Sequence, residues 1–298
     1  MRYTIQGADC RLSVAVYNES APKTLVVLHG MRDHGGSFDL LAGELSGFRV
    51  IIPDLRGHCL SDQNGVYTLT HFTADLMQVF DSFEVQQGYL LGHSLGGHVA
   101  ARFAALFTHR LQGLILVDGF GPPRQIALAS PGRLALLQAA QVRALQHAGR
   151  TRKIMTDAAF ATTRYQTNNP RLDGEVASRL VKQGIGPAAE GGVSWRWDPR
   201  VQMVWSTFSH EDSEALLGNI TCPTCVITGS EGLRYWLLMH PELSGQQLLY
   251  EQELARRVGL IAKARSVVLE GAGHMVHYDV PDAFNQAVLD FLSESTTC

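Results

Sequence analysis

The sequence "GYLLGHSLGGHV", residues 88–99, passes from an apolar run through Gly92-His93-Ser94-Leu95-Gly96 directly into helix-forming residues. Such an abrupt strand-to-helix turn strains the backbone of its serine, and small residues two positions away on either side avoid clashes. The turn lifts the hydroxyl above the sheet edge, beside helix N–H groups that favour developing negative charge. We therefore predict that Ser94 is a nucleophile; the alternative is an ordinary glycine-rich strand–helix connection.

Similar apolar runs recur along the chain, and most of them end in glycine. They are rich in Val, Ile and Leu and nearly continuous, as parallel strands buried on both faces are. Two earlier alternating segments, 2–7 and 11–18, predict an antiparallel start. The pattern predicts an α/β fold, with a mostly parallel eight-stranded sheet flanked by helices. The six predicted buried strands are 24–30, 48–54, 88–94, 113–119, 225–229 and 266–271.

The alternation of strand-like and helix-like segments stops between about residues 120 and 218. Residues 131–149 and 173–184 have helical patterns, and no strand-like run is visible there. We therefore predict a core domain formed by residues 1–120 and 219–298, with a helical cap, residues 121–218, inserted after the sixth strand. The aromatic and methionine side chains of this cap could line an apolar pocket over Ser94 or form the cap's own packing core; they are Trp195, Trp197, Met203, Trp205 and Phe208.

The composition limits the partners of this chain. A net charge of −3 over 298 residues, without a Lys/Arg-rich run, argues against nucleic acid and favours a small-molecule substrate. No apolar stretch approaches the roughly 20 residues of a membrane span, and the N-terminus shows no signal-peptide pattern. We therefore expect a cytoplasmic protein.

Cysteine and histidine usage gives no indication of a disulfide framework or a metal site. Five cysteines, an odd number, fit a reducing compartment. Cys222 and Cys225 precede an apolar run and have no second ligand pair, so we interpret them as a buried structural pair. The twelve histidines contain no HxxxH or HxH spacing. We expect no metal and no cofactor.

A serine hydroxyl needs a base to remove its proton, and the best candidate is His274. It follows the last apolar run, in Gly271-x-Gly273-His274. The carboxyl ends of parallel strands meet at one sheet edge, so this histidine can reach Ser94. His277 is the alternative base, and we expect it to pack or to cap a helix instead.

An acyl-transfer site also needs backbone N–H donors directed at the developing oxyanion. Leu95, directly after the nucleophile, is placed to supply one of them. The second is expected from Met31, which follows His29-Gly30 at the end of the third predicted strand. Glycine at position 30 lets the backbone approach a substrate closely.

Taken together, these motifs resemble the α/β-hydrolase fold superfamily over nearly the whole chain. The matching segments, in order, are 29–30, "DLRGHCLSD" (54–62), 92–96 and "GAGHMVH" (271–277). Two further segments, "HGMRDHGGSFDLL" and "WRWDPR", resemble its serine hydrolase-like, esterase-type branch. The chain departs from the family pattern at Cys59, where a second glycine is usual.

The resemblance implies a triad acid after the sixth or the seventh strand, and this chain is unusual there. In "VITGSEGLRY", residues 226–235, the expected acid position holds Gly232, and Glu231 lies one residue early. Adjacent residues in an extended segment point in opposite directions. Asp118, at the end of the sixth strand, is the alternative, although Asp-Gly is also a common turn pair. We favour Asp118 over Glu231.

Ser94, His274 and Asp118, with Met31 and Leu95 as oxyanion donors, predict a serine hydrolase. The expected substrate is a small carboxylic ester, or a thioester, with an apolar acyl part. A C–C bond hydrolase of the same fold and a non-catalytic ligand-binding protein on this scaffold are the alternatives.

Overall fold

The computed structural model describes residues 1–63, 65–121, 153–237 and 241–294, and the separate positions 135, 138, 139, 142, 143 and 146. Its centre is an eight-stranded sheet with the strand order β1-β2-β4-β3-β5-β6-β9-β10. Strand β2 is antiparallel to both of its neighbours, and every other pair is parallel. The predicted fold class is confirmed. The strands are β1 (Arg2–Gln6), β2 (Arg11–Tyr17), β3 (Lys23–Leu28), β4 (Phe48–Pro53), β5 (Gly88–His93), β6 (Leu111–Val117), β9 (Thr224–Gly229) and β10 (Ala264–Leu269).

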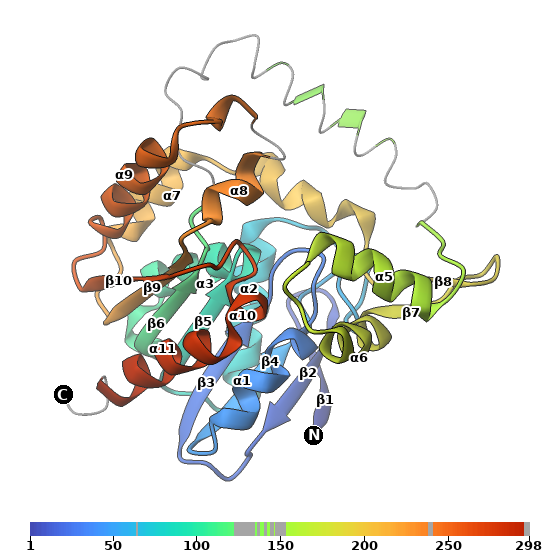
Figure 1. The fold of residues 1–298 in the computed structure, drawn as a ribbon. Coiled ribbons are helices and arrows are strands. Elements are labelled where there is room, and N and C mark those ends of the chain that lie inside the picture. Colours follow the sequence, from blue (N-terminus) through green and yellow to red (C-terminus); the bar gives the residue numbers. More distant parts are fainter. Residues whose placement is uncertain are drawn as a thin grey trace.

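Helices cover both faces of this sheet (Figure 1). In strand β3, Val26 and Leu28 pack toward α2 and α3, whereas Leu25 and Val27 pack toward α1 and α11. This alternation is the two-residue period of a strand buried on both faces. The core helices are α1 (Asp39–Glu44), α2 (Leu69–Ser82), α3 (Leu95–Leu106), α8 (Gly232–Leu237), α9 (Gln247–Val258), α10 (Val276–Asp279) and α11 (Pro281–Glu294), with short 3-10 helices η1 (Gly35–Phe38), η2 (Thr108–Arg110) and η5 (Pro241–Leu243).

One of the predicted strands is not buried on both faces. Strand β10 lies at the edge of the sheet, and its Val268 is 59% exposed. An edge strand has only one neighbour, so its apolar residues are not all covered. The apolar composition of 266–271 does not distinguish an edge from an interior position.

The segment between β6 and β9 contains both helices and a small sheet. The helix predicted over 173–184 is present as α6, whereas most of the helix predicted over 131–149 lies outside the described residues. The prediction that this segment holds no strand is wrong, because β7 and β8 form an antiparallel pair. Each has only three residues, too few for a recognisable pattern. The elements here are α5 (Ala158–Asn168), α6 (Gly174–Gly184), β7 (Ile185–Pro187), β8 (Val193–Trp195), η4 (Pro199–Thr207) and α7 (His210–Leu217).

The aromatic side chains of this segment contribute to packing. Trp195 packs against a small cluster that includes Val181 and Ile185. Trp205 and Phe208 pack against the main core and make edge-on contacts with the His98 ring of α3. A packing role therefore accounts for these three residues.

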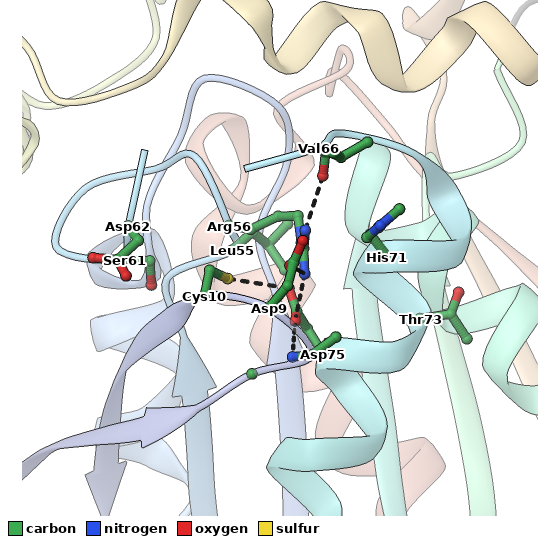
Figure 2. Close-up of polar contacts among 12 residues, drawn as sticks. Asp9, Cys10, Leu55, Arg56, Ser61, Asp62, Val66, His71, Thr73 and Asp75 are labelled. Atoms are coloured by element: carbon green, nitrogen blue, oxygen red, sulfur yellow. Dashed lines mark hydrogen bonds and ion pairs between the residues drawn. The ribbon is translucent and has the colours of Figure 1, made fainter. Parts of the chain in front are cut away.

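A buried ion pair anchors the loop that follows β4 (Figure 2). The guanidinium of Arg56 is almost fully buried and contacts both oxygens of Asp75, at 2.6 and 2.8 Å. It also pairs with Asp9 and donates to the Val66 carbonyl. Breaking such a buried pair leaves an uncompensated charge, which costs roughly 3–5 kcal/mol. The loop that carries Leu55 and His58 is thereby held in one position.

The chain adopts a left-handed backbone conformation at Cys59, where the family pattern has a glycine. Cys59 has a φ of +45° and Gly57 a φ of +78°, both in the left-handed region. All four cysteines among the described residues, Cys10, Cys59, Cys222 and Cys225, are free and buried. No described helix combines the length and the apolar character that a membrane span requires.

Candidate active site

Ser94 occupies a strained turn between β5 and α3. Its φ of 51° and ψ of −115° are unusual for a residue with a side chain. The turn fits because its flanking glycines have no side chains. A Cβ on Gly92 would lie 2.2 Å from the Gly96 carbonyl oxygen, and one on Gly96 would lie 2.5 Å from the Leu28 carbonyl oxygen. Small residues are therefore required at both positions, as the sequence pattern suggests.

The structure brings Ser94, His274 and Asp118 into one hydrogen-bonded chain. His274 Nε2 lies 3.1 Å from Ser94 Oγ, and His274 Nδ1 lies 2.5 Å from Asp118 Oδ2. The carboxylate accepts, so Nδ1 carries the proton and Nε2 is free to accept from the serine hydroxyl. His274 is 7% exposed and Asp118 is 5% exposed. Asp118 follows β6 with a φ of +42°, which turns it toward the histidine loop.

Glu231 lies elsewhere, in an ion-pair network on the surface. Its Oε2 is 2.6 Å from Arg171 Nη2 and 3.0 Å from Arg234 Nη1. Hydrogen bonds from Arg171 and then Arg234 lower the pKa of this carboxyl group. The structure therefore places Asp118, and not Glu231, against His274.

The absence of an acid at position 232 has a local physical reason. A Cβ on Gly232 would lie 2.7 Å from the Tyr250 hydroxyl oxygen, so a side chain there needs Tyr250 to move. Tyr250 is buried, and its pKa is raised by burial and by the negative charge of Asp118. Tyr250 therefore occupies the space that an acid at position 232 would need.

Two backbone segments approach Ser94 where an oxyanion would develop. Leu95 is the first residue of α3, and the first N–H groups of a helix have no partner inside it. A Cβ on Gly30 would lie 3.4 Å from Ser94 Cβ, which shows how close the Met31 loop comes. Within the described part of the chain, neither the Met31 nor the Leu95 N–H donates a hydrogen bond.

Two buried histidines fix the backbone of this loop. His29 donates from Nδ1 to the Gly30 carbonyl at 2.7 Å and accepts at Nε2 from the Leu55 N–H at 2.9 Å. His58 Nε2 accepts from the Arg32 N–H at 3.0 Å, and its Nδ1 donates to the Arg56 carbonyl at 2.9 Å. Each ring therefore acts as both donor and acceptor, which requires the neutral form. Burial lowers the pKa of His29 well below its ordinary value and that of His58 to about 4.

Further residues contact His274, and no sequence pattern points to them. The Tyr235 ring stacks on His274, with ring centroids 3.9 Å apart and an angle of 14° between the planes. His93 Nε2 donates to the His274 carbonyl at 2.9 Å. His93 is the variable residue before Ser94 in the turn motif, and Tyr235 closes the stretch 226–235. Neither position stands out, because both contacts depend on tertiary packing.

His277 is buried and stacks on Phe38, with ring centroids 4.6 Å apart. Its ring has no hydrogen-bond partner among the described residues, and burial lowers its pKa to about 3. With Asp33 and His93 it forms the described group that could hold a metal ion, with donor atoms within 4.8 Å of one another. Ligands of a tetrahedral zinc ion lie about 3.4 Å apart, given bonds of roughly 2.0–2.1 Å. Donor atoms that lie as much as 4.8 Å apart would therefore have to move closer together to bind zinc.

Comparisons with known proteins agree with this architecture. The model of the alpha/beta hydrolase family matches residues 25–287. A serine hydrolase-like protein of Dictyostelium discoideum is 27% identical over 310 aligned positions, covering 97% of this chain and 79% of the relative. Esterase YbfF of Escherichia coli is 21% identical, covering 93% of this chain and 96% of the esterase. The chain therefore belongs to the alpha/beta hydrolase family.

Solved structures show the same fold. The thioesterase domain from the curacin biosynthetic pathway superposes with a TM-score of 0.81 at 22% identity, over 97% of this chain and 99% of that domain. E-2-(acetamidomethylene)succinate hydrolase superposes with a TM-score of 0.77 at 21% identity, over 98% and 99%. Membership of the alpha/beta hydrolase family supports hydrolase activity.

The geometry predicts how turnover responds to the two candidate acids. Asp118→Asn should lower kcat by ~10⁴-fold, because an amide can donate to Nδ1 and thereby impose the wrong tautomer. Glu231→Gln, the matched control, should lower kcat by less than about tenfold, which corresponds to a rise of roughly 1.4 kcal/mol in the activation barrier. Steady-state kinetics on both folded variants checks this. The reverse ranking would assign the acid to Glu231.

The buried neutral histidines predict a fall in stability with acid. The pKa of His58 is lowered to about 4, and those of His98 and His277 to about 3, mainly by burial. The unfolded chain, with histidine pKa values near 6.5, therefore binds more protons below that pH. The full free energy of unfolding is therefore present above about pH 6.5, and part of it is lost progressively as the pH falls toward 4. His58 alone accounts for a loss on the order of 3 kcal/mol.

Urea unfolding between pH 7 and pH 4.5 measures this dependence. His58→Gln should make the slope of unfolding free energy against pH shallower, because the variant lacks one titrating group. The exposed His109, changed to Gln, serves as the control and should leave the slope as it is. A wild-type unfolding free energy that stays constant over this range would contradict the neutral-histidine account.

Proposed function

We propose that this protein is a serine hydrolase that cleaves a small carboxylic ester, or a thioester, through an acyl-enzyme. The observation that carries the proposal is the hydrogen-bonded chain from Ser94 Oγ through the His274 ring to Asp118. A serine alone is a weak nucleophile, and this chain supplies the base and the group that orients it.

Each group in the proposed site has a defined role. His274 takes the Ser94 proton as the oxygen attacks the carbonyl carbon, and Asp118 stabilises the imidazolium. The Met31 and Leu95 N–H groups bind the oxyanion. The imidazolium then protonates the leaving alcohol or thiol. Water activated by His274 attacks the acyl-enzyme, and Ser94 recovers its proton through His274.

The surroundings of His274 support an apolar acyl part in the substrate. Tyr235 stacks on the His274 ring, and Trp236 contacts it edge-on with centroids 6.0 Å apart. Aromatic faces of this kind exclude water and favour apolar groups. An esterase and a thioesterase domain are among the similar proteins, which fits an alcohol or a thiol as the leaving group.

We further propose that residues 121–218 form a cap over the core domain of residues 1–120 and 219–298. Described contacts between the two parts support this division. His34 Nε2 lies 3.0 Å from the Leu180 carbonyl, and the Tyr165 hydroxyl donates to Tyr278 at 3.0 Å. Tyr278 lies four residues after His274, so the proposed cap contacts the segment that carries the base.

The alternative of a non-catalytic binding protein loses its main support. That alternative depended on the anomalous acid position at Gly232, and Asp118 supplies a carboxylate to His274 from another strand.

A C–C bond hydrolase, the second alternative, would use the same serine and histidine. One relative, a putative 2-succinyl-6-hydroxy-2,4-cyclohexadiene-1-carboxylate synthase of Bacillus subtilis, is 25% identical over 95% of both chains.

Single substitutions test the proposed nucleophile and base. Ser94→Ala and His274→Ala should both remove hydrolysis of short esters, and Ser94→Ala should leave thermal unfolding nearly unchanged. His277→Phe keeps an aromatic ring on Phe38 and, as the control for the second histidine, should retain most of the activity. Substantial turnover by purified Ser94→Ala would refute the proposal, and loss only in the His277 variant would reverse the histidine assignment.

A further inference from the structure

Arg32 follows directly after the proposed oxyanion donor Met31, and its backbone is held in an unusual conformation. Its φ is +63°, in the left-handed region that residues with side chains seldom adopt. The Arg32 N–H donates to the neutral His58 ring, which keeps this conformation in place. The backbone that carries the guanidinium is therefore held in one position in the loop that approaches Ser94.

Two side chains from the segment between β6 and β9 hold the guanidinium. Its central carbon lies 5.0 Å from the centre of the Trp197 ring. Nη2 donates to Gln202 Oε1 at 3.2 Å. A charge on an aromatic face is oriented while its edge stays open for hydrogen bonds. Trp197 and Gln202 thus position the group without neutralising it.

The charge of Arg32 has no carboxylate partner among the residues that the structure describes. Arg171, by contrast, pairs with Glu231 and Asp279, and Arg200 pairs with Asp198. The adjacent Asp33 is directed elsewhere, because its Oδ1 accepts hydrogen bonds from Ser37 and Tyr278. Within the same described ranges, Arg32 Nε and Nη1 donate no hydrogen bond, and the side chain is exposed.

Two observations connect Arg32 with the groups around Ser94 and His274. The loop that it extends touches Ser94 at Gly30. On the histidine side, burial raises the pKa of Tyr235, and the positive charge of Arg32 opposes that shift. Tyr235 stacks on His274, so the charge acts on a residue in contact with the base. A substrate carbonyl bound by the Met31 N–H would lie beside the backbone of the residue that carries this cation.

We propose that the substrate is an ester that carries a carboxylate a few bonds from the scissile carbonyl, and that Arg32 binds this carboxylate. The inference rests on the proposed function and narrows its substrate class. The planar guanidinium presents paired N–H groups that match the two oxygens of a carboxylate. The apolar part of the substrate then faces Tyr235 and Trp236, and its charged end faces Arg32.

A competing interpretation makes Arg32 only a contact between the two parts of the chain. Its bonds to Trp197 and Gln202 would then hold the segment in place, and its loss would affect all substrates alike. Charge recognition and structural support therefore differ in one measurable quantity. That quantity is the ratio of kcat/KM for a carboxylated ester to kcat/KM for a neutral ester of similar size.

The test uses two matched substrate pairs on the full-length chain. Monoethyl succinate and ethyl pentanoate place the difference in charge on the acyl side. Para-acetoxybenzoate and para-tolyl acetate place it on the leaving group. Acid release is followed for wild type, Arg32→Gln, Arg32→Lys and the control Arg234→Gln, which removes an exposed arginine paired with Glu231.

For at least one pair, Arg32→Gln should lower the ratio by about tenfold or more, equivalent to roughly 1.4 kcal/mol. Arg32→Lys, which keeps the charge but loses the planar fork, should give an intermediate ratio. Arg234→Gln should leave both ratios as in wild type. In wild type, added salt should raise KM for the carboxylated ester more than for the neutral one.

If Arg32→Gln lowers kcat/KM by the same factor for all four esters, the inference is overturned and Arg32 has a structural role. Unchanged ratios in both pairs would overturn it as well, while the esterase proposal would stand. If Arg32→Gln fails to fold, as monitored by thermal unfolding, the ratios of Arg32→Lys distinguish charge recognition from structural support in its place. If wild type hydrolyses none of the esters, the proposed function fails and the inference fails with it.

Discussion

The geometry of the candidate active site rests on close backbone contact around Ser94. Gly96 lies against the Leu28 and His29 carbonyls, and a Cβ on Gly97 would lie 2.7 Å from the Cα of Gly119. Because these glycines have no side chains, α3 packs directly on the ends of β3, β5 and β6. Those three strand ends carry the loop of Gly30 and Met31, Ser94, and Asp118. The strain at Ser94 is held by contacts that no larger residue allows.

A layer of neutral imidazoles extends this constraint outward. His29 and His58 hold the backbone on either side of Met31, and His93 holds the carbonyl of His274. Burial makes each ring costly to protonate, and this keeps its donor and acceptor pattern fixed. The buried Arg56–Asp75 pair in turn holds the loop that supplies His58 (Figure 2). A buried ion pair thus holds the loop that supplies His58, whereas the rings that hold the Met31 backbone are neutral and directional.

The sequence predicted the eight core strands and a mostly parallel sheet with an antiparallel start, because apolar runs and turn glycines are local signals. The same patterns identified Ser94 and His274, which the structure places in contact. The choice between Asp118 and Glu231 could not be made from spacing alone. It depends on the left-handed turn at Asp118 and on Tyr250, whose hydroxyl blocks a side chain at position 232. The three-residue strands β7 and β8 and the stacking of Tyr235 also depend on tertiary contacts.

The proposed mechanism requires that Ser94 carries the acyl group during turnover. This can be measured by rapid quenching of the enzyme with a slowly deacylating ester, followed by intact-mass and peptide mass spectrometry. We expect a transient adduct with the mass of the acyl group, located on Ser94 and decaying at the rate of turnover. Hydrolysis at the full rate with no adduct, or an adduct on another residue, would contradict the mechanism.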